Sequence, residues 1–192
     1  MGRRQLLDTD AFEAILSGAE ETDSLEFKAA MPWDRNTLVK DILAMANVID
    51  GGQIVIGVAD GSFERQGLTE QQIATYDIDK MRDAVAPFAD PRVVFRREVA
   101  VDCNGLRYII IEVSPFEDFP VICCRDGADV TAGTVYFRSR ARRPQSARVA
   151  SSAEMRDIIE RSAALSMRRL ARLGFVAQPE NTYDYDAELR GL

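Results

Sequence analysis

The sequence predicts an α/β (α+β) fold, in which a mixed central β-sheet is flanked by helices and followed by a C-terminal helix. Three observations predict it. Residues 53–59 form a nearly continuous apolar run, which is typical of a central strand covered on both faces. Segments 35–49 and 151–173 carry apolar residues at helical spacing. Asn104-Gly105 lies between two apolar segments, where it indicates a hairpin turn.

The elements of the N-terminal half follow from caps and periodicity. Asp8 or Asp10 can cap a helix over 8–18, which Gly18 ends, and residues 24–28 alternate like a short strand. Asp34 is an N-cap for the helix over 35–49. The apolar strand over 53–59 follows. A Thr69-x-x-Gln72 capping box then begins a helix that we expect over 69–86.

The C-terminal half follows in the same way. The hairpin consists of strands at 92–101 and 106–113, with further strands at 120–124 and 134–139. The long helix over 151–173 is capped by Ser151 or Ser152 and ended by Gly174. We therefore expect one domain over residues 1–174, and a polar, loosely ordered tail over 175–192.

Composition limits the surroundings and the chemistry. No apolar run reaches roughly 18 residues, so no membrane-spanning helix is expected. The three cysteines form no C-x-x-C pair, which favours reduced core thiols in a cytoplasmic protein. The absence of histidine excludes Ser-His-Asp and Cys-His catalysis and His-liganded zinc. Carboxylates with a hard cation, Mg²⁺ or Mn²⁺, remain the economical choice for an enzyme.

Acidic residues near two strands are the candidate chemical groups. Glu26 lies on the polar face of its strand, and Asp60 follows the buried strand at its C-terminal end. Side chains at such strand ends can converge on one pocket, where carboxylates repel each other unless they share a cation or a proton. The alternative is an ordinary exposed strand face, with Lys28 beside Glu26, and a simple turn at Asp60-Gly61.

Two further features have a functional and a structural interpretation. Gly51-Gly52 could let backbone amides approach a phosphate, or could only end a helix and form a turn. The net charge of −7 repels polyanions, so nucleic-acid binding requires a local basic patch. The candidate patch could contact phosphates or pair with the surplus acids. It consists of Arg138, Arg140, Arg142, Arg143 and Arg148, just after Tyr136 and Phe137.

Taken together, four segments resemble the Schlafen/AlbA-like domain family. Residues 21–28 (ETDSLEFK) look like its opening, 40–47 (KDILAMAN) like its helix, and 51–60 (GGQIVIGVAD) like its glycine-containing strand. The fourth segment, 135–138 (VYFR) followed by Arg142-Arg143-Pro144, looks like its terminal strand and arginine-rich loop. The resemblance covers roughly residues 12 to 165.

The resemblance implies a nucleic-acid-binding domain for RNA or DNA. By the family's motifs, Glu21, Glu26 and Asp60 would form the carboxylate triad of a metal-dependent (ribo)nuclease and hold Mg²⁺ or Mn²⁺. Lys28 would stabilise developing negative charge, and Arg138, Arg140, Arg142 and Arg143 would position the nucleic acid. The alternatives are a non-catalytic DNA- or RNA-binding module and a nucleotide (ATP)-binding regulatory module that uses Gly51 and Gly52. A homodimer could form the groove that paired domains form in the family.

Overall fold

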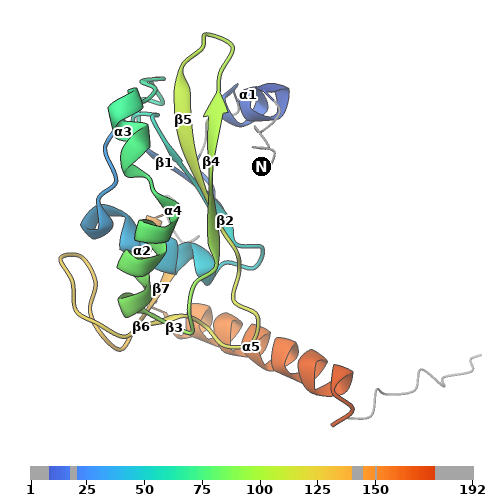
Figure 1. The fold of residues 1–192 in the computed structure, drawn as a ribbon. Helices are drawn as coiled ribbons and strands as arrows, with labels where there is room; N and C mark the ends of the chain where they lie inside the picture. The colour runs from blue at the N-terminus through green and yellow to red at the C-terminus, as the bar shows by residue number, and fades with distance from the viewer. Residues whose placement is uncertain (1–8, 18–20, 140–144, 150, 176–192) are drawn as a thin grey trace, which may run out of the picture.

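Two four-stranded sheets and five α-helices make up the described part of the chain, which comprises residues 9–17, 21–139, 145–149 and 151–175 of the computed structural model (Figure 1). The first sheet has the strand order β1-β2-β5-β4. Its strands are β1 (Leu25–Lys28), β2 (Gly52–Ile56), β4 (Phe95–Val101) and β5 (Arg107–Val113). β1 and β2 are parallel, whereas β5 is antiparallel to both β2 and β4. The predicted mixed sheet is therefore confirmed.

Both faces of the first sheet are covered, as the apolar run of β2 predicted. Ile54 and Ile56 point into the larger core, which lies beneath α2 (Arg35–Ala46). Val55 points to the opposite face, where Phe12 of α1 (Thr9–Ser17) packs. β2 ends at Ile56, earlier than predicted, because Gly57 takes a φ of +115° that leaves the strand conformation.

Local capping explains where the main helices begin. The Asp34 side chain accepts a hydrogen bond from the Asn36 N–H and thereby caps α2. Thr69 and Gln72 form the predicted reciprocal capping box of α3 (Glu70–Thr75). The single helix expected over 69–86 is wrong, since Tyr76 and Asp77 interrupt it. Asp77 caps a separate α4 (Ile78–Val85) by accepting from two backbone N–H groups.

The second sheet was not predicted. It has the order β3-β6-β7-β8, with antiparallel pairing throughout. Its strands are β3 (Ala89–Asp90), β6 (Ile122–Cys123), β7 (Thr134–Ser139) and β8 (Gln145–Arg148), with the 3₁₀ turn η1 (Ala86–Phe88) before the first. β7 and β8 both pack against α2. α2 is therefore the element that joins the two sheets.

The C-terminal helix α5 (Ser152–Arg172) begins at the predicted cap, because the Ser151 hydroxyl accepts from the Glu154 N–H. Gly174 follows it with a left-handed φ of +76°. In Figure 1, the C-terminal half of α5 extends past the rest of the domain. Within the described residues, no helix has the length and apolar character needed to cross a bilayer.

The prediction of core thiols is wrong for two of the three cysteines. Only Cys123 is a core thiol; Cys103 and Cys124 are exposed, because they lie in a hairpin turn and at the end of a short strand. The tail predicted over 175–192 lies outside the described residues except for Phe175, as do residues 140–144 of the arginine-rich loop.

Candidate functional site

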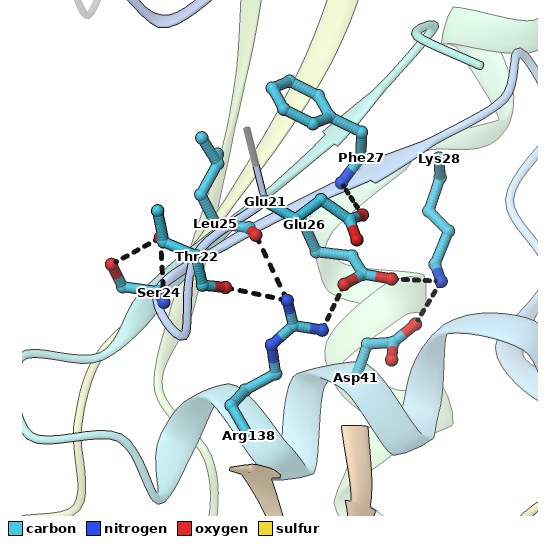
Figure 2. Close-up of polar contacts among 9 residues, drawn as sticks. All are labelled: Glu21, Thr22, Ser24, Leu25, Glu26, Phe27, Lys28, Asp41 and Arg138. Carbon is cyan, nitrogen blue, oxygen red and sulfur yellow. Dashed lines mark hydrogen bonds and ion pairs between the residues drawn. The ribbon is translucent and has the colours of Figure 1, made fainter. Parts of the chain in front are cut away.

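A network of alternating charges surrounds Glu26, which is only 7% exposed although it lies on the polar face of β1 (Figure 2). Its Oε1 accepts a hydrogen bond of 2.6 Å from the Lys28 Nζ, and its Oε2 accepts from the Arg138 guanidinium. Two cations therefore hold the two oxygens of one carboxylate. A buried carboxylate requires such partners, because burial without them disfavours its ionised form.

Lys28 connects this network to α2. It lies two residues after Glu26, so both side chains point to the same side of the strand. Its Nζ is also 3.1 Å from Oδ2 of Asp41, a buried residue on α2. Burial alone would lower the pKa of Lys28, but the charges of Asp41 and Glu26 outweigh it and raise that pKa. Lys28 therefore remains a fixed positive charge between two carboxylates.

Arg138 of β7 is completely buried and binds the N-terminal segment of the chain. Besides the Glu26 carboxylate, its guanidinium donates to the Thr22 carbonyl at 2.8 Å and to the Leu25 carbonyl at 3.2 Å. The sequence indicated a surface residue for nucleic-acid contact. In this arrangement the guanidinium instead links the second sheet to β1, because three acceptors around the start of β1 converge on it (Figure 2).

Glu21 lies beside this network and retains partial exposure. Its Oε1 accepts a hydrogen bond of 3.2 Å from the Phe27 N–H, which folds the side chain back over β1. Burial is the main cause of its raised pKa, and the negative charges of Glu26 and Asp60 raise that pKa further. Asp60 itself is exposed in the turn after β2. Glu21 therefore interacts electrostatically with both of the other predicted carboxylates, Glu26 and Asp60.

The three carboxylates differ in whether their oxygens are free to bind a metal cation. Both oxygens of Glu26 are occupied by cations of the chain, whereas Glu21 and Asp60 have exposed surface. No group of three or more Asp, Glu or Cys side chains in the described ranges is arranged to hold a metal ion. The cations of the chain leave Glu21 and Asp60 as the predicted carboxylates with exposed surface, and Mg²⁺ is often bound through one or two carboxylates together with a substrate phosphate.

Gly51 and Gly52 are buried between β1, β5 and α2. Gly51 has a φ of +74°, and a side chain there would collide with the Val113 carbonyl. A side chain on Gly52 would collide with the sulfur of Met45. Close backbone packing accounts for both glycines, and their role as a phosphate loop stays a prediction.

Positive charge is concentrated in one part of the chain. Residues 134–175, from β7 to the end of α5, contain ten arginines and three acidic residues, which gives a net charge of +7. Since the whole chain carries −7, the remaining residues carry −14. Arg140, Arg142 and Arg143 belong to this segment but lie outside the described residues, so their predicted contacts with nucleic acid remain predictions.

Two buried polar residues, Asp41 on α2 and Asn47 at the C-cap of α2, were missed as parts of the site. Asp41 completes the ion network, and Asn47 joins α2 to the second sheet through hydrogen bonds from its amide to the Val121 and Tyr136 carbonyls. Both stand at helical spacing among apolar residues that face the core. A polar residue at such a position is the signal that could have found them, since burial requires a partner.

This is an α/β domain in which one lysine and one buried arginine hold a cluster of acidic side chains. The sequence model of the family described as "Schlafen, AlbA_2" matches residues 21–145, which include that whole cluster. The chain belongs to the Schlafen AlbA_2 family. No curated protein matches it.

Two solved structures are similar to this chain. The DIP2311 protein from Corynebacterium diphtheriae has 19% sequence identity and a TM-score of 0.53, with 82% of this chain and 32% of that one covered. This likeness supports the fold, and the chain spans about a third of the length of that protein. The other is the N-terminal domain of a protein from Nitrosomonas europaea described as related to the ATP-dependent DNA helicase RecG. Its identity is 18% and its TM-score 0.42, with 75% of this chain and 94% of that domain covered.

Proposed function

We propose that this domain binds nucleic acid through its arginine-rich C-terminal part. The observation that carries the proposal is the separation of charge: +7 over residues 134–175 in a chain that is otherwise strongly acidic. Arginine binds phosphate oxygens in a bidentate manner, and it supplies every basic residue of this segment. The acidic remainder repels polyanions, so binding would be confined to this part of the domain.

The buried ion network gives this segment its place in the fold. Arg138 holds β7 against the start of β1, and the arginines at 140, 142 and 143 follow β7 directly in the sequence. On α5, Arg168 and Arg172 are exposed and extend the basic segment. Arg138 also binds the Thr22 carbonyl, so a phosphate backbone bound by the arginines that follow β7 would run near the adjacent, half-exposed Glu21.

The test is binding of RNA and DNA, single- and double-stranded, over a range of salt concentrations. Affinity should fall steeply with salt, because each phosphate contact releases counterions. The double variant Arg142→Gln/Arg143→Gln should bind more weakly at low salt. The slope of the logarithm of its affinity against the logarithm of salt concentration should be smaller by about one to two, since up to two phosphate contacts are lost. The control Arg35→Gln/Arg82→Gln changes two exposed arginines on α2 and α4 and should bind like the wild type. Absence of binding by the wild type at low salt would refute the proposal.

A second candidate function, metal-dependent cleavage of a phosphodiester, is favoured by the electrostatic coupling of Glu21 with Asp60 and Glu26. Bound Mg²⁺ or Mn²⁺ would supply charge stabilisation and an activated water. We assign Glu21 and Asp60 to cation binding. We assign Glu26 a positioning role, because Lys28 and Arg138 bind both of its oxygens and it thereby fixes these two side chains. Lys28 contributes a fixed positive charge beside it.

Metal binding and cleavage are measured separately. Mn²⁺ titrated into the protein should broaden nuclear magnetic resonance signals near Glu21 and Asp60, and Glu21→Gln or Asp60→Asn should abolish the broadening and any cleavage. The control Asp79→Asn removes an acid whose side chain is 86% exposed, on α4, and should change neither. If Mn²⁺ causes no local broadening, or both site variants cleave at the wild-type rate, the carboxylate assignment is wrong.

A further inference from the structure

The helix α5 has two apolar faces, of which only one packs on the domain. On the inner face, Ile158 is 2% exposed, the Ser162 hydroxyl donates to the Asp118 carbonyl at 2.7 Å, and Arg161 stacks 4.1 Å above the Phe116 ring. On the outer face, apolar side chains remain in solvent within the described part of the chain. They are Ile159 at 57%, Met167 at 61%, Leu170 at 38% and Leu173 at 59% exposure.

The outer residues have the spacing of a helix–helix seam. Ile159, Ala163, Ser166, Leu170 and Leu173 follow one another at alternating intervals of four and three residues. This alternation places one stripe along a helix and is the pattern by which two helices interdigitate. The large residues stand at the two ends of the stripe and the small ones, Ala163 and Ser166, near its middle, where two helices can approach closely.

The charges on α5 favour one orientation for the second helix. All three acids of the helix, Glu154, Asp157 and Glu160, lie in its N-terminal half. Its C-terminal half carries Arg168, Arg169 and Arg172 without an acid. With Arg156 and Arg161, the N-terminal half has a net charge of −1, and the C-terminal half has one of +3, of which Arg169 is paired with Asp118. An antiparallel copy therefore brings the basic half of one helix beside the weakly acidic half of the other, whereas a parallel copy would place the two basic halves together.

We propose that α5 forms an antiparallel helix pair with α5 of a second copy of this chain, centred on Ser166. In this register Ile159 of one copy lies against Leu173 of the other at each end of the seam, and Leu170 of one copy lies over the small Ala163 of the other. Such a pair is two-fold symmetric, which is the commonest form of protein dimer. The C-terminal half of α5 is accessible for it, because it extends past the domain (Figure 1). The apolar seam itself contains none of the arginines assigned to nucleic-acid binding, so a Leu170 variant tests the dimer separately from that proposal.

Sedimentation of the full chain tests the association. At micromolar concentrations the wild type should have twice the monomer mass of 21.4 kDa. Leu170→Glu places a charge in the seam and should give the monomer mass. Ala164→Glu places the same charge at an exposed position on another face of α5 and should leave the dimer intact. Circular dichroism confirms that each variant is folded. A monomeric wild type, or a dimeric Leu170→Glu variant, would overturn the proposal.

Disulfide cross-linking tests the orientation. In a background in which the exposed Cys103 and Cys124 are replaced by serine, Ser166→Cys should form a covalent dimer on oxidation, because residue 166 faces its own copy at the two-fold axis. Ile159→Cys should not, since antiparallel helices place the two copies of residue 159 at opposite ends of the seam. Cross-linking of both variants would indicate a parallel pair, and cross-linking of neither would exclude the seam.

Discussion

Arg138 on β7 donates to the Glu26 carboxylate on β1, across 112 residues of sequence and between the two sheets. The arginine is completely buried, and the glutamate nearly so. The pair fixes where the second sheet lies relative to the acidic cluster. It also rules out the alternative interpretation of Glu26 and Lys28 as an ordinary exposed strand face, since Glu26 is buried.

Removal of Arg138 is expected to destabilise the domain strongly. Arg138→Met keeps much of the volume but leaves Glu26 buried with Lys28 as its remaining cationic partner, which should cost about 3 kcal/mol of unfolding free energy in urea. Arg96→Met removes an arginine from the exposed pair with Glu112 and should cost less than about 1 kcal/mol. Glu26→Gln combined with Arg138→Met should recover part of the loss. Equal costs for the two single arginine variants would contradict this account.

Asn47 should be nearly as important, although it carries no charge. Its amide donates to the carbonyls of Leu43, Val121 and Tyr136, and its Oδ1 accepts from the Val121 N–H at 2.8 Å. Asn47→Leu leaves several of these buried groups without a partner, which should cost roughly 2–4 kcal/mol. Asn36→Ala, at an exposed position on the same helix, should change the unfolding free energy by less than about 0.5 kcal/mol. A mild Asn47→Leu variant would mean that water replaces these bonds.

A comparison of alanine substitutions at Gly51 and Gly61 distinguishes the cost of backbone strain from the cost of close packing. Both have left-handed φ values, +74° and +77°, but only Gly51 has atoms close to the position of a side chain. Gly61→Ala should therefore cost only the conformational term, about 1 kcal/mol. Gly51→Ala adds a collision with the Val113 carbonyl, which should lower the free energy of unfolding by roughly a further 1–3 kcal/mol. Thermal unfolding of the two variants in parallel measures the difference, and equal midpoints would refute the packing explanation.

Glu21 should make the stability of the domain depend on pH. Its pKa in the folded state lies above the ordinary glutamate value of 4.5, because of burial and of the charges on Glu26 and Asp60. The folded state therefore binds the proton more tightly, and stability falls as pH rises from about 4.5 through the folded pKa. Glu21→Gln keeps an oxygen for the Phe27 N–H and removes the charge. The variant should match the wild type at pH 4 and be more stable at pH 7, by a modest amount since Glu21 is partly exposed. A stability difference that does not change with pH would contradict the raised pKa.

Features that depend on neighbours in sequence were predicted well. Asp34, Thr69 and Ser151 cap the helices that their positions indicated, because a cap and its backbone partner are only two or three residues apart. The apolar β2 and the Asn-Gly hairpin were also found from local pattern alone. The break at Tyr76 and Asp77 was missed, since the apolar spacing continues through it.

Features that depend on distant partners were not predictable in this way. Strands of two residues, such as β3 and β6, have no periodicity to detect. The burial of Arg138 depends on acceptors at Thr22, Leu25 and Glu26, and the sequence around position 138 does not indicate these partners. The convergence of Glu26 and Asp60 was predicted from their positions near strand ends, whereas Glu21 was added through the family motif, because strand alternation alone leaves the partners of Glu26 undefined.

The contacts of Asn47 and Arg138 also have a consequence for biosynthesis. These residues lie 74 to 116 positions from their partners in the sequence. β1 and α2 therefore leave the ribosome before β7, and some of their polar groups gain hydrogen-bond partners only after β7 has emerged. Closing such long loops slows folding more than it weakens the folded state. A nascent chain halted before residue 138 should therefore lack the buried cation that binds Glu26 and the Thr22 and Leu25 carbonyls, and protection of β1 from proteases should rise once β7 has emerged.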